Sequence, residues 1–408
     1  MDQNTTDVGG PRGAAPNTNA SLTIVIPAYN EQEAIGSTVK RTLSCRAEVM
    51  ERGALHAIQI IVVDDGSTDA TAQIAGSFEE IELVSFGANR GYGAAIKEGF
   101  RRGDGDLLAF LDADGTCDPR FFGDLCAALA HEQADIALGS RLTPESRMPR
   151  VRRLGNRIFA TMLGMLANRR VTDAASGMRV VRRDALNQLG RLPDGLHYTP
   201  AMSARAVLCG LRMVEIPMPY EERRGESKLS VWKDGVRFAR AIIDGVLFFR
   251  PARLFLIGAA LALAIAALIT LSPFEYYVRN RSVQEWMIYR FVVAFLFGSV
   301  GFLSLSAAAI ATRMTDLRAV SPDRTFWEAG IARLFQSPFS AAGAIALGLG
   351  AVVLLWPGIV EYLTTGELTL HWSRVIVAAF ALFLAFQTMM TRMLLRIIQI
   401  WLEAPEAT

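Results

Sequence analysis

Apolar and polar residues are distributed differently before and after residue 250. Four long stretches without a charged residue follow it, at 254–271, 291–312, 334–360 and 375–391. A helix that crosses a bilayer needs about 20 mostly apolar residues. The pattern therefore predicts four membrane spans, and four uncharged stretches in a row disfavour the alternative of buried helices in a large soluble core. We expect a transmembrane domain over residues 251–400, with spans at about 254–272, 290–312, 338–360 and 374–396.

Residues 21–230 show a second pattern, in which short apolar runs alternate with helical stretches. Apolar runs typical of strands buried on both faces occur at 22–27 and 58–63. Further strands are expected at 81–86, 107–111 and 136–138. Helices are expected between them, at about 31–44, 69–78, 92–102 and 119–131. This alternation predicts an α/β domain with a mostly parallel sheet. On such sheets, ligands bind beyond the carboxyl ends of the strands.

Polar clusters follow four of the predicted strands, at 27–31, 64–69, 89–93 and 112–115. Asp112 and Asp114 are the most informative, because two carboxylates two positions apart at a strand end can both reach one divalent cation. Oxygen ligands suit Mg²⁺ or Mn²⁺, and the ion would stabilise a nucleotide diphosphate as a leaving group. An ordinary turn is the alternative, and Asp64 and Asp65 at a neighbouring strand end weigh against it. No P-loop motif occurs, and no GxGxxG follows the first strand.

Composition and charge narrow the classes of partner. The formal net charge of +2 gives no basic field for nucleic acid, and four scattered cysteines do not suit a disulfide scaffold. Residues 141–157 contain six arginines and one acid. Beside a membrane, this cluster favours a phosphate-bearing lipid over a simple solvated basic face. A lipid phosphate is already an anion and needs no general base, and the four histidines fall in no catalytic pattern.

The four clusters and three later segments resemble the family 2 glycosyltransferases with the GT-A fold. The resemblance is closer to the polyprenyl-phosphate sugar synthases of the dolichol-phosphate mannosyltransferase type. The first four pieces are Val25-Ile-Pro-Ala-Tyr-Asn-Glu31, Val63-Asp-Asp-Gly-Ser-Thr-Asp69, Asn89-Arg-Gly-Tyr-Gly93 and Asp112-Ala-Asp114. The later, more specific pieces are Gly139-Ser-Arg141, Asp173-Ala-Ala-Ser-Gly177 and Gly225-Glu-Ser-Lys228. The resemblance implies an α/β GT-A glycosyltransferase domain at residues 21–229.

The resemblance also implies a role for individual residues. Asp112 and Asp114 would bind the cofactor, Mg²⁺ or Mn²⁺, and would act in catalysis with Arg141. The acceptor phosphate would be bound by Arg141 and Arg153. The nucleotide-sugar would be bound by Pro27, Tyr29, Glu31, Asp64, Asp65, Arg90, Asp112, Ser227 and Lys228.

Two positions depart from the family pattern. Thr116 stands where many relatives have a glutamine that serves as a further metal ligand. Glu222 stands where relatives often have an arginine, and Arg223 and Arg224 follow it one and two residues out of register.

The remaining segments predict the placement of the chain in a membrane. Residues 230–250 form a basic amphipathic helix suited to the bilayer interface, and 326–335 are similar. Residues 1–20 lack signal-peptide features and are expected to be a disordered tail. Residues 401–408 are expected to be a C-terminal tail. The loop after the second span carries four arginines, which indicates the cytoplasmic side. We therefore expect an integral membrane protein with a cytoplasmic catalytic domain and both termini in the cytoplasm.

The predicted reaction is transfer of a hexose from GDP-mannose or UDP-glucose to a dolichyl or undecaprenyl phosphate. A single displacement at the anomeric carbon would invert its configuration. The expected partners are the nucleotide-sugar, the polyprenyl phosphate and membrane lipids, and self-association into a homo-oligomer is left open. Two alternatives are a processive polysaccharide synthase, whose Gln-x-x-Arg-Trp segment the chain lacks, and a non-catalytic membrane protein that binds nucleotide-sugars. Intact Asp112 and Asp114 argue against the second.

Overall fold

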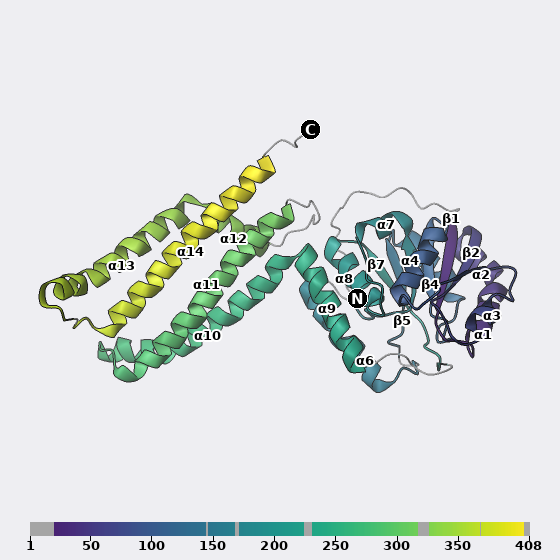
Figure 1. The fold of residues 1–408 in the computed structure, drawn as a ribbon, viewed down its shortest axis with the longest axis horizontal. Helices are drawn as coiled ribbons and strands as arrows, with labels where there is room; N and C mark the ends of the chain where they lie inside the picture. Colours follow the sequence, from purple (N-terminus) through teal and green to yellow (C-terminus); the bar gives the residue numbers. More distant parts are fainter. Residues whose placement is uncertain are drawn as a thin grey trace, which may run out of the picture. The chain divides into compact units, whose positions relative to one another are not determined.

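The computed structural model describes residues 20–143, 146–167, 171–223, 231–316, 326–367 and 369–403. The chain divides into two compact units, Met1–Gly245 and Val246–Thr408. Figure 1 shows that the first contains a β-sheet with helices on both faces and that the second consists of long helices.

The first unit is built on a seven-stranded mixed sheet with the order β3-β2-β1-β4-β6-β5-β7. Its strands are β1 Ala20–Ala28, β2 Leu55–Asp64, β3 Glu82–Ser85, β4 Leu107–Leu111, β5 Ile136–Ser140, β6 Met178–Arg182 and β7 Met213–Pro217. All pairings are parallel except those of β6, which runs antiparallel to β4 and β5. All five residues of β4 are buried, as its continuous apolar run predicts.

Helices cover both faces of this sheet. They are α1 Ile35–Ser44, α2 Arg46–Gly53, α3 Thr71–Ala75, α4 Tyr92–Arg102, α5 Phe121–His131, α6 Arg150–Ala167, α7 Arg183–Gln188 and α8 Tyr198–Cys209. One apolar core contains Ile24 of β1 with residues of α1, α2 and α5. The other contains Val25 with residues of α4 and α8. Neighbouring strand residues point to opposite faces, so the two cores lie on opposite sides of the sheet. α9, Val231–Phe249, follows and crosses the boundary between the units.

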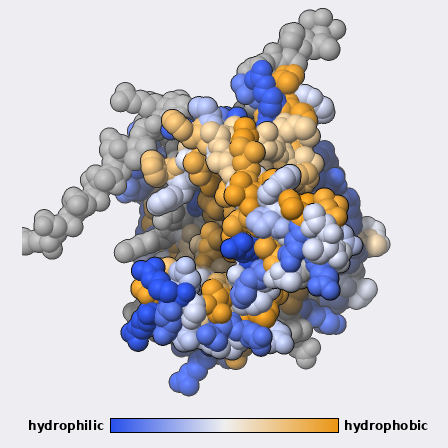
Figure 2. All heavy atoms as spheres, turned by 90° about the vertical axis from the view of Figure 1, so that its left-hand side faces the viewer, coloured by the Kyte–Doolittle hydropathy of each residue, from blue (hydrophilic) through white to orange (hydrophobic). Residues whose placement is uncertain are grey.

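The second unit contains four helices that are long and apolar enough to cross a membrane, at Pro251–Asn280, Glu285–Asp316, Pro338–Thr365 and Trp372–Trp401. Each contains one predicted span. Its elements are α10 Pro251–Asn280, η1 Glu285–Met287, α11 Ile288–Asp316, α12 Phe326–Gln336, α13 Pro338–Thr365 and α14 Trp372–Glu403. Large apolar side chains such as Leu261, Leu349 and Phe386 are exposed on these helices. Figure 2 shows apolar residues, in orange, over much of the face that it views. The prediction of an α/β domain followed by four apolar helices is confirmed.

Polar contacts attach the short helix α12 to three of the long helices. Arg253 of α10 pairs with Glu328, with 3.1 Å between Nε and Oε1, and both side chains are buried. Near the other end of α12, Arg313 of α11 donates to Gln336. Arg392 of α14 donates to the carbonyl of Phe335 at 2.7 Å. Arginines from three helices therefore hold this amphipathic segment at both of its ends.

Candidate active site

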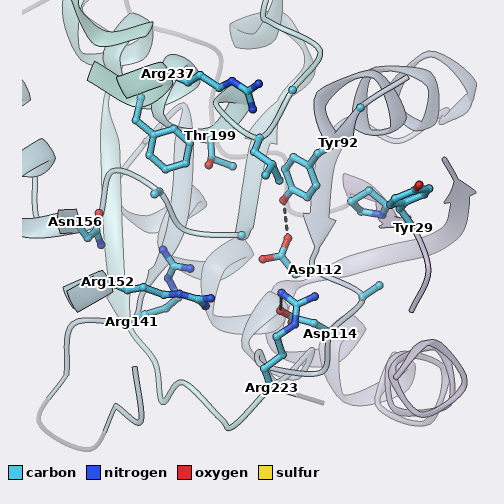
Figure 3. A pocket seen from close by; sticks show the side chains of 18 of the residues that line it. Tyr29, Tyr92, Asp112, Asp114, Arg141, Arg152, Asn156, Thr199, Arg223 and Arg237 are labelled. Carbon is cyan, nitrogen blue, oxygen red and sulfur yellow. Dashed lines mark hydrogen bonds and ion pairs between the residues drawn. The ribbon is translucent and has the colours of Figure 1, made fainter. Parts of the chain in front are cut away.

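A cavity of about 520 Å³ opens at the carboxyl ends of β1 and β4, where the sequence predicts a ligand. Its walls come from strand ends, from the N-terminus of α4, and from α6, α8 and α9. In the view of Figure 3, Tyr29 lies on one side and Arg141 and Arg152 lie on the other, with Asp112 and Asp114 between them. The cavity therefore brings carboxylates and arginines from distant parts of the chain together.

The residues at the end of β1 line one side of this cavity. Pro27, Tyr29 and Glu31 belong to its wall, and so does Asp65, which follows β2. The Asp65 carboxylate accepts hydrogen bonds from the backbone N–H groups of Arg90 at 2.7 Å and Gly91 at 2.9 Å. Burial raises the pKa of Asp65, although these two hydrogen bonds oppose the shift. Asp65 thus fixes the loop between β3 and α4 against the end of β2.

Two residues that the resemblance assigned to the nucleotide-sugar point elsewhere. The Arg90 guanidinium lies over the ring of Phe86, 4.6 Å from its centroid. Asp64 is buried, and its carboxylate accepts a hydrogen bond from the backbone N–H of Ser67 at 3.3 Å. Neither residue belongs to the described wall of the cavity. Ser227 and Lys228 lie outside the described residues.

Asp112 and Asp114 follow β4 and line the centre of the cavity. The Tyr92 hydroxyl donates to Asp112 Oδ1 at 2.6 Å (Figure 3). Burial and then the charge of Asp114 raise the pKa of Asp112 to about 7. A cation close to both carboxylates would reverse this shift, because it favours their ionised forms. Asp114 Oδ1 accepts from the backbone N–H and the hydroxyl of Thr116, at 3.1 and 2.7 Å.

Gly177 packs directly against the Asp112 carboxylate. A Cβ atom at this position would lie 1.8 Å from Asp112 Oδ2. The backbone N–H of Asp112 also donates to the carbonyl of Gly177 at 3.3 Å. Asp112 is therefore confined between the Tyr92 hydroxyl on one side and the backbone before β6 on the other.

We expect Gly177→Ala to lower the free energy of unfolding by about 1–3 kcal/mol, the usual cost of overpacking a filled site. Gly155 of α6 is a matched control, because it lines the same cavity but its Cβ would meet no atom within 4 Å. Gly155→Ala should leave stability unchanged or raise it, since alanine is the better helix former. Denaturant unfolding of both variants checks this, and equal stabilities would contradict the close packing of Gly177 on Asp112.

Arg223 lines the cavity, although it stands one residue out of register with the arginine of the family pattern. Its Nη2 lies 2.6 Å from Glu31 Oε1, and its Nη1 lies 3.4 Å from Asp114 Oδ2. The backbone N–H of Glu221 donates to the carbonyl of Thr116 at 2.9 Å, so the segment that carries Arg223 runs beside the Asp112–Thr116 loop. Arg223 is thus the cation that faces Asp114 in this structure.

Arg141 lines the cavity while it is anchored by a buried carboxylate. Its Nε and Nη2 donate to the two oxygens of Asp173 at 2.8 and 3.0 Å, and Asn156 Nδ2 also donates to Asp173 at 2.8 Å. The Asp173 side chain is 0% exposed. Burial opposes the ionised form of Asp173, but the charge and hydrogen bonds of Arg141 outweigh burial and lower its pKa to about 2. The same ion pair outweighs burial at Arg141 and raises its pKa.

The arginines of α6 differ in where they point. Arg153, assigned to the acceptor phosphate by the resemblance, donates to the backbone carbonyl of Ser146 at 2.7 Å and does not belong to the described wall of the cavity. Arg152 does line the cavity. Apolar side chains surround this part of the wall. The rings of Phe159 on α6 and Phe238 on α9 pack edge to face, with 5.8 Å between their centroids.

The donor set of the cavity suits a hard divalent cation. Asp112 and Asp114 could bind Mg²⁺ or Mn²⁺, because such ions take oxygen ligands and are commonly held by one or two carboxylates together with substrate phosphates. Within the described parts of the chain, no three His, Cys, Asp or Glu side chains are grouped so that they could hold a metal ion.

The comparison with protein families matches the same region. The family model described as glycosyl transferase family 2 matches residues 23–190. The chain contains a family 2 glycosyltransferase domain. The resemblance inferred from the sequence is therefore confirmed, and Asp112, Asp114, Arg141 and Gly177 all lie inside this glycosyltransferase domain.

Curated relatives of this chain include two proteins of Haloferax volcanii. The low-salt glycan biosynthesis hexosyltransferase Agl6 is 33% identical over 60% of this chain and 59% of that protein. A dolichyl-phosphate hexose transferase is 29% identical over 54% of this chain and 92% of that protein. An undecaprenyl-phosphate 4-deoxy-4-formamido-L-arabinose transferase of Salmonella choleraesuis is 28% identical over 73% of this chain and 90% of that protein. The first of these matches thus spans less than two thirds of the relative.

Among solved structures, glucosyl-3-phosphoglycerate synthase from Mycobacterium tuberculosis, in complex with Mn²⁺, uridine diphosphate and phosphoglyceric acid, is similar to this chain. The identity is 20% and the TM-score is 0.44, over 56% of this chain and 78% of that protein.

Proposed function

We propose that this glycosyltransferase moves a hexose from a nucleotide-sugar to a polyprenyl phosphate. The observation that carries the proposal is one cavity lined by the Asp112 and Asp114 carboxylates and by Arg141, whose side chain is 13% exposed. The carboxylates suit a metal-bound diphosphate, and the guanidinium suits a second phosphate. Relatives named as dolichyl-phosphate and undecaprenyl-phosphate sugar transferases support the same acceptor class.

The proposed reaction is a single displacement. A phosphate oxygen of the lipid attacks the anomeric carbon, the bond from that carbon to the donor diphosphate breaks, and the nucleoside diphosphate leaves. The attack inverts the configuration, and the acceptor anion requires no base from the protein. Bound Mg²⁺ or Mn²⁺ would offset the charge of the leaving diphosphate. The protein then contributes positioning and charge stabilisation, with Arg141 facing the acceptor phosphate and Pro27, Tyr29, Glu31 and Asp65 facing the nucleoside.

We also propose that the second unit crosses the membrane four times and leaves both termini and the glycosyltransferase domain in the cytoplasm. Four helices of sufficient length and apolar composition support the spans. Arg313 and Arg333, which flank the second and third spans, support the orientation. In this arrangement the lipid tail stays in the bilayer, and its phosphate reaches the domain at the level of the headgroups.

The test is incubation of the purified full-length protein with radiolabelled GDP-mannose, UDP-glucose and other nucleotide-sugars. Each reaction contains undecaprenyl or dolichyl phosphate and Mg²⁺ or Mn²⁺, and ends with organic extraction. We expect label in the organic phase with at least one donor, and none with excess EDTA, because the metal offsets the charge of the leaving group. Full activity in EDTA would contradict the metal requirement. Transfer to growing polysaccharide instead of lipid phosphate would contradict the acceptor.

A further inference from the structure

Arg223 binds two carboxylates of the cavity, Glu31 at 2.6 Å and Asp114 at 3.4 Å. These carboxylates come from the loops after β1 and β4, so one guanidinium joins two strand ends of the sheet. The Arg223 side chain is 21% exposed, and those of Glu31 and Asp114 are 12% and 10% exposed. Charges with so little solvent around them interact more strongly than an exposed surface pair.

The backbone that carries Arg223 is attached to the loop after β4. The N–H of Glu221 donates to the carbonyl of Thr116 at 2.9 Å, and the Glu221 carboxylate lies 3.1 Å from Arg41 Nη1. Arg41 also donates to the carbonyl of Cys117 at 2.5 Å. These contacts hold the segment before Arg223 beside the two aspartates. The backbone contacts of this segment therefore place Arg223 beside Asp114, so that the ion pair does not depend on the side-chain conformation of Arg223 alone.

We infer that Arg223 competes with the divalent cation for Asp114 and exchanges this carboxylate for the donor diphosphate when metal and nucleotide bind together. The inference rests on the proposed function, and it adds an order to the binding of metal and donor. The metal alone would bind weakly, and the metal–nucleotide complex would bind tightly.

The physical reason is the charge balance at Asp114. A dication that approaches Asp114 alone must share the carboxylate with a guanidinium, and the two positive charges repel each other. A diphosphate brings negative charge and planar pairs of oxygen acceptors, which suit the arginine fork. Arg223 then has a new partner, and Asp114 is released to the cation. Metal and nucleotide should therefore increase each other's affinity by the same factor, in the range of about 5- to 150-fold.

The experiment measures Mn²⁺ binding to the full-length protein in detergent by electron paramagnetic resonance, with and without UDP or GDP. In the wild-type protein, we expect the nucleotide to tighten Mn²⁺ binding by at least about 5-fold. In Arg223→Gln, Mn²⁺ alone should bind more tightly than to the wild type, and the tightening by nucleotide should be smaller. Unchanged or weaker binding of Mn²⁺ alone to Arg223→Gln would overturn the inference.

Two further variants make the result specific. Arg101→Gln removes the same charge at an exposed residue that pairs with Glu98, and it should bind Mn²⁺ as the wild type does. Equal tightening in Arg101→Gln and Arg223→Gln would overturn the inference, since net charge alone would explain it. Arg223→Lys keeps the charge but loses the fork. It should bind Mn²⁺ alone as weakly as the wild type and show less tightening by nucleotide, which tests the exchange even if Arg223→Gln does not fold.

This inference and the proposed function fail in different ways. In one outcome, the wild-type protein transfers sugar with metal, but Arg223→Gln binds Mn²⁺ alone no more tightly than the wild type does. This result would support the proposed function and contradict the inference about Arg223. A wild-type protein that transfers no sugar to any polyprenyl phosphate contradicts the function, whatever the Mn²⁺ titrations give.

Discussion

Replacing Asp114 with alanine should reduce sugar transfer about a thousandfold. Metal-ion stabilisation of a leaving group's charge is worth several kcal/mol, and each 1.4 kcal/mol corresponds to a factor of about ten in rate. Asp114 provides one of the two carboxylates at the end of β4, and its Oδ2 faces Arg223 at 3.4 Å. The measurement is the initial rate of transfer to polyprenyl phosphate at saturating Mg²⁺ or Mn²⁺.

The fold should survive this change, because Arg223 keeps its shorter contact with Glu31. Circular dichroism and thermal unfolding of Asp114→Ala check that point. Asp104→Ala is the matched control, since Asp104 is an exposed aspartate before β4, at the opposite end of that strand. It should transfer sugar at the wild-type rate. If a folded Asp114→Ala protein had wild-type activity, the Asp114 carboxylate would not be required for sugar transfer.

Replacing Arg141 with alanine should lower the free energy of unfolding by about 3–5 kcal/mol, because it leaves a buried carboxylate without its cation. Asp173 is 0% exposed and accepts two hydrogen bonds from the Arg141 guanidinium. Denaturant unfolding of the purified protein measures the loss. Arg101→Ala is the control, because Arg101 pairs with Glu98 at the exposed surface and its removal should change stability little.

A double replacement separates the ion pair from other effects of Arg141. Arg141→Leu combined with Asp173→Leu should recover part of the stability lost by Arg141→Ala, since it removes the buried Asp173 charge together with its cation. An Arg141→Ala protein as stable as the wild type would show that Asp173 does not need its cation. For acceptor binding, Arg141→Lys is the better variant, because it keeps the charge. We expect it to use lipid phosphate less efficiently than the wild type and to bind the nucleotide normally.

The sequence predicted the parts of the sheet whose strands are continuous apolar runs. β1 and β4 are examples, and Leu107–Leu111 was predicted with its observed bounds. β6 was not predicted, because its sequence Met178-Arg-Val-Val-Arg182 contains two arginines. Arg179 is nevertheless fully buried, where it donates to the Ser203 hydroxyl at 2.8 Å and to the carbonyl of Ala174 at 3.0 Å. Only the fold provides these acceptors, so local hydrophobicity could not reveal this strand.

The same distinction holds for the site. Asp112 and Asp114 were predicted because they are close in sequence and end one strand. The residues that contact these aspartates were not predicted as their partners, although Tyr92 belongs to the polar cluster at 89–93 that the sequence analysis describes. Arg223 and Glu31 are 192 positions apart, and Arg141 and Asp173 are 32 apart. A charge pair of this kind has no sequence spacing that identifies it, because the sheet brings its members together.

The antiparallel strand β6 has a consequence for how the protein is made. It lies between β4 and β5 in the sheet, yet it follows β4 by roughly 70 residues in the chain. At a synthesis rate of about 5–20 residues per second, β4 would wait on the order of 4–14 s at the ribosome for this neighbour. During that time one edge of an entirely apolar strand lacks its partner, which invites pairing with other chains. Gly177, which confines Asp112, arrives together with β6. This part of the sheet, and the packing around the Asp112 carboxylate, therefore cannot be completed until β6 has been synthesised.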